Sequence, residues 1–416
     1  MHALVVSALA ALDVACAMRL AAYQMPGHTC SPQGVEQERP ANESGNAGDF
    51  PVDAVYTWVA QPTEDEFRKI AATCNQTMTG GMQRFRNLGT FRFSLRMLEL
   101  NIPWIRNVFL VTNGEIPGWI DTSNPKLKLI QHSDIWPADL AERVLPVFNS
   151  QAIEVYLHRI PGLSERFIYF NDDMFVGRPL EKSFFFTDDG KPMQYSSVTK
   201  IKQWCQAPFP YAPAKIEHMP YVLSLSMIRE IQARWPSHFM QIGKARCRGE
   251  VSVDWGPAFH YGWYAIQSDQ GAMKAGRFAW LNDLNVNHME EWYHEQLSNP
   301  PDLGCINDDF EIADAAKFER QQRMLLEFMN NMSKHKRSSF EKDGEQEQKY
   351  ALRYLPRYSN NTLIRIPSLL IDDAVRYNRS NISAQAPRPG SSPAYPHVMN
   401  ETQHNDTLSA PEHTLH

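Results

Sequence analysis

The stretch Phe167-Ile168-Tyr169-Phe170-Asn171-Asp172-Asp173 places an apolar and aromatic run directly before two carboxylates. A short continuous run of this kind is typical of a strand buried in a parallel sheet. Because ligands of open α/β sheets bind outside the carboxyl ends of the strands, the two aspartates would face a ligand there. An isolated Asp-Asp pair more often forms a turn or a helix cap, and that alternative stays open.

A second Asn-Asp-Asp tripeptide, at 307–309, follows another apolar pair, Cys305-Ile306. Mg²⁺ and Mn²⁺ prefer carboxylate oxygens, and Mg²⁺ often uses one or two of them together with phosphate oxygens. Two copies of the tripeptide weaken the turn interpretation. They make a divalent-metal site a hypothesis, but they do not decide between it and two ordinary turns.

Around these stretches, strand-like runs alternate with segments of helical spacing. The predicted strands are 52–58, 107–112, 127–131 and 167–170, and the predicted helices are 64–74, 90–100, 150–159 and 216–235. Such alternation predicts an α/β fold. We expect a Rossmann-like, mostly parallel sheet flanked by helices, with an additional helical portion.

Composition narrows the class of protein. Of the 416 residues, 43% are hydrophobic, and this excludes a wholly disordered or fibrous chain. The net charge of -6 argues against a nucleic-acid binder that works by bulk electrostatics. The six cysteines include no Cys-x-x-Cys pair, so a zinc ribbon is not indicated. One or two disulfides with a spare thiol fit the count, but the pairing does not follow from the sequence.

The two ends of the chain differ from its middle. An apolar run within 1–25 indicates a signal peptide or a signal anchor, although Asp13 and Arg19 interrupt it. Residues 26–50 have the composition of a linker, and 383–416 that of a disordered polar tail. Between them we expect a main domain over 51–342 and a C-terminal extension over 343–382. Eight Asn-x-Ser/Thr sequons are consistent with a glycoprotein of the secretory pathway.

Several single residues are candidates for chemistry, each with an ordinary alternative. His218 opens a predicted helix and could act as a general base, although packed or capping histidines are commoner. The arginine pairs 84/86 and 246/248 suit phosphate recognition, although surface arginines are usually only solvated. One or two tryptophans could stack on a sugar, but spacing does not identify which. Those in the body include Trp104, Trp119, Trp136, Trp204, Trp255, Trp263, Trp280 and Trp292.

Taken together, these segments resemble the Stealth family of sugar-1-phosphate transferases. That family includes bacterial capsule polymerases and the catalytic α/β subunit of N-acetylglucosamine-1-phosphotransferase. Residues 52–59 (VDAVYTWV) are similar to the family's first region, and 84–173 to its long and specific second region. His218-Met219-Pro220 with the following helix resembles the third region, and 305–309 (CINDD) the fourth. The resemblance covers about residues 51–342 and implies a Stealth-type catalytic domain there.

The resemblance implies a phosphotransferase. A hexose-1-phosphate, by default N-acetylglucosamine-1-phosphate, would pass from a UDP-sugar to a hydroxyl of a glycan acceptor. A phosphodiester forms and UMP leaves. The expected partners are therefore a nucleotide-sugar donor and a glycan or glycoprotein acceptor, with Mg²⁺ or Mn²⁺ as cofactor and no nucleic acid. Further expectations are a homodimer, location in the Golgi or ER lumen, and membrane association through the N-terminal segment.

Carried over motif by motif, the resemblance implies three sets of site residues. The catalytic set is Asp53, Glu154, Asp173 and His218; the donor-binding set is Arg86, Arg246, Arg248 and Trp58; the metal-binding set is Asp172, Asp173, Asn307 and Asp308. The stretch around Cys247 does not decide whether Arg246 or Arg248 contacts phosphate. Ala60-Gln61 departs from the Asn-Gly that the family usually has after its first region.

Two other functions are consistent with the same residues. A metal-dependent glycosyltransferase would break the sugar–phosphate bond and release UDP. A catalytically inactive relative would bind glycans or act as a scaffold. The joint presence of the acidic set and His218 argues against the inactive relative, because a binding protein does not need all of these groups.

Overall fold

The computed structural model describes residues 49–74, 85–196, 216–251, 256–281, 286–308, 315–342, 351–359, 362–370 and 374–376. The predicted signal peptide or anchor, nearly all of the predicted linker and the predicted polar tail lie outside these ranges. Across the helices of the described ranges, none combines the length and the apolar character that crossing a membrane requires.

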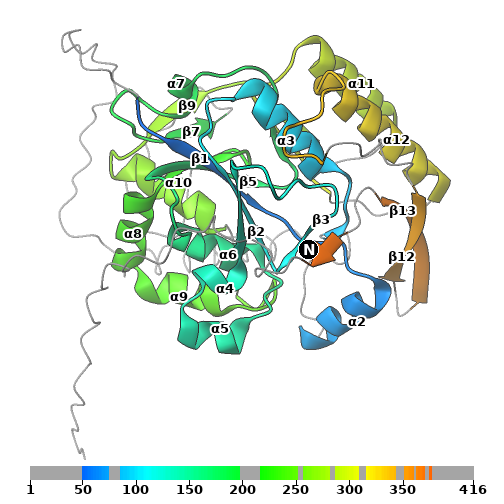
Figure 1. The fold of residues 1–416 in the computed structure, drawn as a ribbon, viewed down its shortest axis with the longest axis horizontal. Helices are drawn as coiled ribbons and strands as arrows, with labels where there is room; N and C mark the ends of the chain where they lie inside the picture. The colour runs from blue at the N-terminus through cyan, green and yellow to red at the C-terminus, as the bar shows by residue number, and fades with distance from the viewer. Residues whose placement is uncertain are drawn as a thin grey trace, which may run out of the picture. The chain divides into compact units, whose positions relative to one another are not determined.

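A five-stranded sheet forms the centre of the fold, and four of its strands run parallel (Figure 1). The fifth strand lies at one edge, antiparallel to its neighbour. All residues of the two central apolar strands β1 and β2 are buried, as expected of a parallel sheet covered on both faces. The mostly parallel sheet is thus confirmed. In sheet order the strands are β4 (Leu127–Gln131), β2 (Val108–Thr112), β1 (Val52–Thr57), β5 (Arg166–Asn171) and β8 (Tyr221–Ser224).

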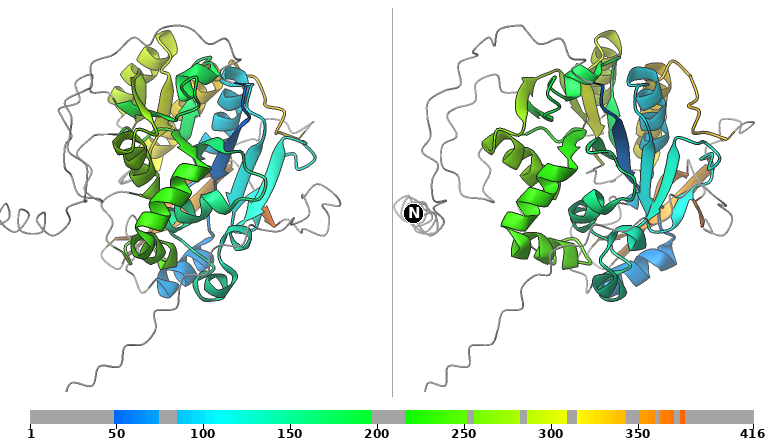
Figure 2. Two further views of the ribbon diagram at one scale, coloured as in Figure 1. Left: turned by 90° about the vertical axis from the view of Figure 1, so that its left-hand side faces the viewer. Right: turned by 60° about the vertical axis from the view of Figure 1, so that its left-hand side comes forward.

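Helices cover both faces of this sheet. Figures 1 and 2 show α8 and α10 on one side of it and α3 on the other. The helices are α2 (Glu64–Thr73), α3 (Thr90–Asn101), α4 (His132–Ile135), α5 (Ala138–Val144), α6 (Ser150–Tyr156), η2 (Leu157–Arg159), α7 (Lys182–Phe185), α8 (Leu225–Arg234), α9 (Pro236–Lys244), α10 (Pro257–Gln267), α11 (Val286–Ser298) and α12 (Ala315–Met332).

The single helix predicted over 216–235 is wrong in its first part. Residues Tyr221–Ser224 form the edge strand β8, because the run Tyr-Val-Leu pairs with β5 and buries its side chains there. Ser224 then caps the helix, and its hydroxyl accepts a hydrogen bond from the amide of Met227 at 3.4 Å. The helix therefore begins at Leu225, seven residues after His218.

A second, three-stranded sheet lies beside the first. It has the order β10 (Phe278–Leu281), β11 (Leu303–Ile306) and β6 (Met174–Val176), and β11 runs antiparallel to β6. Three strand pairs complete the described strands: β3 (Glu115–Pro117) with β14 (Ala374–Arg376), β7 (Met193–Ser196) with β9 (Ala272–Ala275), and β12 (Ala351–Ser359) with β13 (Thr362–Leu370). The predicted C-terminal extension thus contains strands that the sequence pattern did not indicate.

Helix α3 connects the two halves of the core. Phe91, Leu95 and Leu98 recur at the spacing of one helix face and belong to the cluster built on the central sheet. Phe93 and Met97, on another face, belong to a second cluster that includes residues of α11, α12 and β6. This second cluster is the additional helical portion that the sequence predicted. Because α3 is covered on both of these faces, it has little surface left for water.

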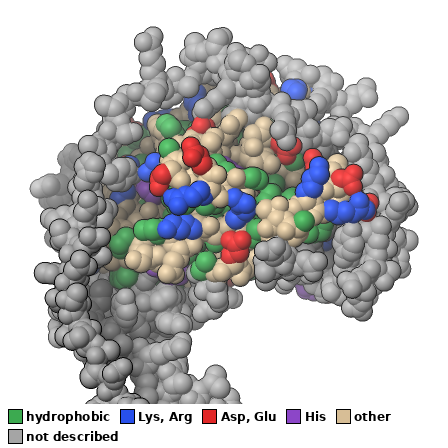
Figure 3. Space-filling view, turned by 90° about the horizontal axis from the view of Figure 1, so that it is seen from below, with side chains coloured by type: hydrophobic (Ala, Val, Ile, Leu, Met, Phe, Trp, Pro, Cys, Tyr) green, Lys and Arg blue, Asp and Glu red, His purple; other side chains and the backbone are tan. Residues whose placement is uncertain are grey.

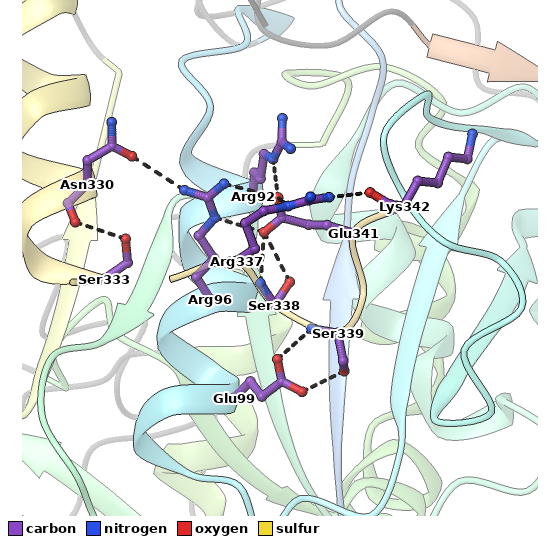
Figure 4. Close-up of polar contacts among 10 residues, drawn as sticks. All are labelled: Arg92, Arg96, Glu99, Asn330, Ser333, Arg337, Ser338, Ser339, Glu341 and Lys342. Atoms are coloured by element: carbon purple, nitrogen blue, oxygen red, sulfur yellow. Dashed lines mark hydrogen bonds and ion pairs between the residues drawn. The ribbon is translucent and has the colours of Figure 1, made fainter. Parts of the chain in front are cut away.

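A buried ion cluster fixes α3 from a distant part of the chain (Figure 4). The carboxylate of Glu341 accepts hydrogen bonds from Arg92 Nε and Arg96 Nε, both at 2.7 Å, and its side chain is fully buried. The backbone N–H of Ser338 donates to the same carboxylate at 2.9 Å. Burial alone would raise the pKa of Glu341, but Arg96, Ser338 and Arg92 lower it to about 2.

A disulfide between Cys74 and Cys247 joins the end of α2 to the segment after α9, across 173 residues of sequence. The sequence could not assign this pair. Cys305, on β11, is buried and has a free thiol. On the face of the molecule seen in Figure 3, basic and acidic side chains lie next to one another, and neither sign gathers into a single field.

We expect Glu341→Gln to lower the free energy of unfolding by about 3–5 kcal/mol, because it leaves two buried arginines without a counter-charge. In the wild type, the depressed pKa of Glu341 stabilises the fold above pH 4.5. That contribution is lost as the pH falls from 4.5 through about 2, and the variant should lack this dependence. Chemical denaturation at a series of pH values measures both effects.

The matched control is Glu319→Gln, which removes a partly exposed carboxylate paired with the exposed Arg323 within one helix, α12. It should change stability by about 0.5 kcal/mol or less. Equal losses in the two variants would mean that the buried cluster does not hold α3 in place.

Candidate active site

The turn after β5 and the end of β11 bring the two Asn-Asp-Asp copies together. Antiparallel pairing sets Cys305 opposite Met174, and the amide of Ile306 donates to the carbonyl of Asp173 at 2.8 Å. Asn307 and Asp308 therefore lie beside Asp172 and Asp173. Since Asn171 ends a parallel strand of the central sheet, this group occupies the carboxyl edge, where the sequence placed a ligand.

The carboxylates at this edge repel one another. Burial, and then the charge of Asp173, raises the pKa of Asp172 to about 8. The thiol of Cys305 lies against Asp173, and burial together with that carboxylate raises its pKa well above the usual value. The pair Asp172–Asp173 thus carries negative charge in a confined place, and a bound cation would relieve that repulsion.

Arg86 reaches the same group from the beginning of the second family region. Its Nε and Nη2 atoms both donate to the carboxylate of Asp308, and Nε lies 2.5 Å from Oδ2. The guanidinium also packs 4.7 Å from the ring centre of Phe318. The positive charge of Arg86 therefore balances the carboxylate of Asp308. Among the residues that the structure describes, no three His, Cys, Asp or Glu side chains converge as a metal site; Asp309 lies outside them.

A layer of hydroxyl groups continues the site across β5 and β8. Tyr169 bonds to Thr57 Oγ1 at 3.0 Å and donates to Asn171 Oδ1 at 2.7 Å. Its ring stacks on that of Tyr221, with 5.9 Å between centroids. The hydroxyl of Tyr221 in turn lies 2.6 Å from Nδ1 of His218. Strand β8 is therefore what connects the candidate base to the edge that holds the carboxylates.

Glu154, on α6, lies near this layer of hydroxyl groups. Its buried carboxylate accepts a hydrogen bond from the amide of Ala258 at 3.1 Å. Burial raises the pKa of Glu154 to about 7, although that hydrogen bond and the charge of Arg248 lower it. Burial raises the pKa of Tyr169 and of Tyr221, and the charge of Glu154 adds to both shifts, so Glu154 acts electrostatically on both hydroxyls. A carboxyl group poised near neutrality is suited to proton transfer.

The structure distinguishes the two arginines around Cys247. Arg246 donates from Nε to the carbonyl of Val144 at 2.8 Å and also holds the carbonyl of Arg143, so its guanidinium secures backbone. Arg248 donates to the hydroxyl of Ser150 at 2.7 Å and acts on Glu154. The disulfide at Cys247 anchors the loop that carries both. Of the two, Arg248 is the one that faces the site.

Asp53 and Trp58 do not join the other site residues. Asp53 is paired with Phe167 in the sheet, whereas Thr57 is paired with Asn171, so Asp53 lies about 13 Å from the carboxyl edge. Trp58 is buried in the core, its ring centre 6.3 Å from that of Phe91, which leaves no face for a donor. The buried carboxylate of Asp53 accepts hydrogen bonds from Arg106 Nε (2.9 Å), Asn107 N (3.1 Å) and Ser164 N (2.8 Å).

Sequence reasoning missed the tyrosine pair. Tyr221 is three residues after His218, and Tyr169 is inside the predicted strand 167–170. Both could have been found from one signal: a tyrosine in an otherwise apolar strand next to candidate acids and bases needs a polar partner for its hydroxyl.

Comparison with known proteins identifies the class to which this arrangement belongs. Residues 84–194 match "Stealth protein CR2, conserved region 2", and residues 217–267 match "Stealth protein CR3, conserved region 3". Conserved region 2 contains Glu154, Asp172 and Asp173, and conserved region 3 begins one residue before His218. The resemblance to the Stealth family of sugar phosphotransferases is confirmed.

Several curated relatives are bacterial polysaccharide phosphotransferases. An exopolysaccharide phosphotransferase of Streptomyces coelicolor is 32% identical over 303 residues, which cover 68% of this chain and 51% of the relative. A capsular polysaccharide phosphotransferase of Aeromonas hydrophila is 40% identical over 149 residues, 34% of this chain and 40% of the relative. The chain thus spans about half the length, or less, of these relatives. A galactosyltransferase structure aligns with 67% of this chain and 95% of its own, at 10% identity and a TM-score of 0.36. A likeness this slight indicates nothing about function.

We expect Glu154→Gln to change how stability depends on pH. A glutamate whose pKa is raised to about 7 stabilises the fold fully below pH 4.5, and this contribution is lost as the pH rises through 7. Glutamine keeps the acceptor for Ala258 but cannot ionise. At pH 8 the variant should therefore be more stable than the wild type by up to about 3 kcal/mol, and at pH 4 the two should be equal. Urea denaturation at both pH values measures the difference.

Glu142→Gln, at an exposed position of α5, is the control and should leave the pH dependence unchanged. A Glu154→Gln curve parallel to that of the wild type from pH 4 to pH 8 would show that Glu154 is ionised at neutrality.

Proposed function

We propose that this protein transfers a hexose-1-phosphate from a UDP-sugar to a hydroxyl group of a glycan acceptor. N-acetylglucosamine-1-phosphate is the default group. A phosphodiester forms and UMP leaves. One observation carries the proposal: strands β5, β6, β8 and β11 bring the carboxylate pair Asp172–Asp173 and the base candidate His218 to one edge, in a chain with two Stealth regions. The similarity to polysaccharide phosphotransferases supports phosphotransfer to a polysaccharide.

The reaction requires one bond to form and one to break. The acceptor oxygen attacks the phosphorus that carries the sugar, and the bond from that phosphorus to the oxygen of UMP breaks. The bond between the sugar's C1 and its oxygen stays intact, so the anomeric configuration is kept. Catalysis of such a transfer consists mainly of positioning and of stabilising charge on the phosphoryl oxygens.

His218 takes the proton of the acceptor hydroxyl in this mechanism. Its Nδ1 is hydrogen-bonded to the hydroxyl of Tyr221, so Nε2 is the proton-accepting atom. This assigns the tautomer in which Nδ1–H donates to the oxygen of Tyr221. The high pKa of Tyr221, raised by burial first and then by Glu154, keeps its hydroxyl protonated and neutral beside the histidine. Tyr221 thereby orients the ring without competing for the proton.

The side chains at the carboxyl edge fit a divalent cation. Asp172 and Asp173 repel one another, and oxygen ligands of this kind are those that Mg²⁺ and Mn²⁺ prefer. The two carboxylates, with the amide oxygen of Asn307, would hold the ion, whereas Asp308 is committed to Arg86. A bound ion would supply positive charge to the phosphoryl oxygens. Arg248, which donates to Ser150 and whose charge acts on Glu154, would add to that charge.

The disulfide supports a location in the secretory pathway. Disulfides persist in the oxidising ER lumen and beyond, and they are rare in reducing cytosol. The bond between Cys74 and Cys247 is therefore consistent with the Golgi or ER lumen. The side chain of Asn331, which begins a sequon at the end of α12, is exposed, as a glycan attachment site requires.

The released nucleotide tests the proposal. The purified full chain is incubated with UDP-N-acetylglucosamine, Mg²⁺ or Mn²⁺ and methyl α-mannoside, and the nucleotide is identified by chromatography. We expect UMP together with a phosphodiester-linked product. Release of UDP would mean that the sugar–phosphate bond breaks, as in a glycosyltransferase. Absence of turnover with every common UDP-sugar would favour a glycan-binding relative.

We expect Asp173→Asn and His218→Ala each to lower the transfer rate by a factor of about 100 or more. His218 is the proposed base, and a general acid–base group typically contributes that much. Asp173 would hold the cation that supplies positive charge to the phosphoryl oxygens. Initial rates of UMP release at saturating donor measure the loss. His335→Ala and Asp139→Asn, at exposed positions, serve as controls of the same residue types and should keep the wild-type rate. A folded Asp173→Asn or His218→Ala variant that keeps most of the rate would remove that residue from the catalytic set.

A further inference from the structure

Trp280 exposes an aromatic face next to the candidate base. Its side chain is 40% exposed, and the only other exposed large hydrophobic side chain among the described residues is Met240, on α9. Removing the exposed indole surface from water would be favourable, because burial of apolar area lowers the free energy. A single exposed hydrophobic residue needs no explanation, so the surroundings of Trp280 decide whether its exposure has a meaning.

Those surroundings are aromatic. The ring of His218 lies 5.4 Å from that of Trp280 and stacks on Phe259 at 5.9 Å, with an interplanar angle of 16°. Phe259 also packs against Tyr221, at 5.3 Å and nearly perpendicular. We call the surface formed by Trp280, Phe259 and His218 the aromatic platform. It is built from β10, from α10 and from the segment before β8, so three separate parts of the chain converge on it.

The platform adjoins the carboxylate edge. Strand β10 pairs in parallel with β11, and the amide of Asn307 donates to the carbonyl of Leu281 at 2.9 Å. Trp280 thus directly precedes Leu281, the residue whose carbonyl is hydrogen-bonded to Asn307 of the second Asn-Asp-Asp copy. On its other side, His218 is bonded to Tyr221 in the hydroxyl layer. A ligand lying on the indole would have the proposed base on one side and would lie next to the strand pair that leads into the second Asn-Asp-Asp copy.

We propose that the aromatic platform binds a pyranose ring of the acceptor glycan and presents one of its hydroxyl groups to His218. A pyranose has an apolar face of C–H groups and a polar rim of hydroxyls, which match an exposed indole bordered by polar side chains. The inference rests on the proposed function, because that function makes His218 the base for the acceptor hydroxyl. It names Trp280 as the residue that selects a flat sugar ring over other alcohols.

The donor's uracil is the competing occupant, since a nucleobase also stacks on indole. Position favours the acceptor. The group that must lie next to His218 is the attacking hydroxyl, whereas uracil is separated from the reacting phosphorus by a second phosphate and a ribose. A ring that covers Trp280 is therefore expected to carry the hydroxyl itself.

Binding measured without the donor tests this proposal independently of catalysis. Saturation-transfer NMR is recorded on the full chain with methyl glycosides of mannose, glucose, galactose and N-acetylglucosamine, and separately with UMP. We expect at least one methyl glycoside to bind the wild type, with its ring C–H protons receiving the strongest transfer. Trp280→Ala should abolish that signal. Trp280→Phe, which keeps a flat ring, should retain it, and so should Met240→Ala, which removes the other exposed apolar side chain.

Kinetics with the best methyl glycoside provide the second measurement. Trp280→Ala should raise the acceptor KM about 10-fold or more, while the donor KM stays within about twofold of wild type. Glycoside binding that is unchanged in Trp280→Ala would overturn the platform. So would a wild type that binds none of the four glycosides, or a loss confined to UMP. If the glycosides bind through Trp280 but no UMP is ever released, the platform stands and the proposed reaction fails.

Discussion

The fold depends on helix α3 being held between two cores. Its sheet-facing residues complete the central cluster, and its opposite face completes the cluster made with α11, α12 and β6. A helix buried on both faces cannot keep two arginines in its middle unless a counter-charge is buried with them. Glu341 supplies that charge from the far end of the domain. The position of α3, and with it the spacing between the two sheets, is therefore set by one carboxylate.

The site exists because the chain changes sheets at Asp172-Asp173. Strand β5 belongs to the central sheet and β6 to the second one, and only these two residues separate them. The carboxylates therefore lie at the junction, where β11 adds the other Asn-Asp-Asp copy and β8 adds the tyrosine that holds His218. Residues far apart in sequence meet there because each lies next to a strand terminus at this edge. Asp172 and Asp173 directly follow β5, Asn307 directly follows β11, and His218 shortly precedes the start of the antiparallel strand β8.

The parts of this arrangement that could be predicted are those that local sequence encodes. Continuous apolar runs indicated β1, β2 and β5, and a strand that ends in Asp-Asp indicated the ligand-facing edge. Long-range features could not be predicted this way. The resemblance placed Asp53 and Trp58 in the site, but a residue at the start of a parallel strand faces the opposite edge, and an aromatic ring after a strand is as readily a core residue. Strand β8 was not predicted because its four residues directly precede a helix and are too few to show an alternating pattern of their own. Glu341 lies 245 residues from its partner Arg96, and Cys247 lies 173 residues from its partner Cys74. Patterns in the local sequence do not reveal pairs separated by such distances.

The disulfide has a consequence for the unfolded chain. Cys74 and Cys247 enclose the whole second family region and part of the third, because 173 residues separate them. A crosslink around a loop of that length removes conformational freedom from the unfolded state, worth about 5 kcal/mol in a chain-entropy treatment. The same polypeptide made in a reducing cytosol would have to order β1, β2, β5 and β8 without that restriction. Its thermodynamic margin would then depend on packing and on the buried Glu341 cluster, so the compartment of synthesis influences how securely the carboxylate edge is assembled.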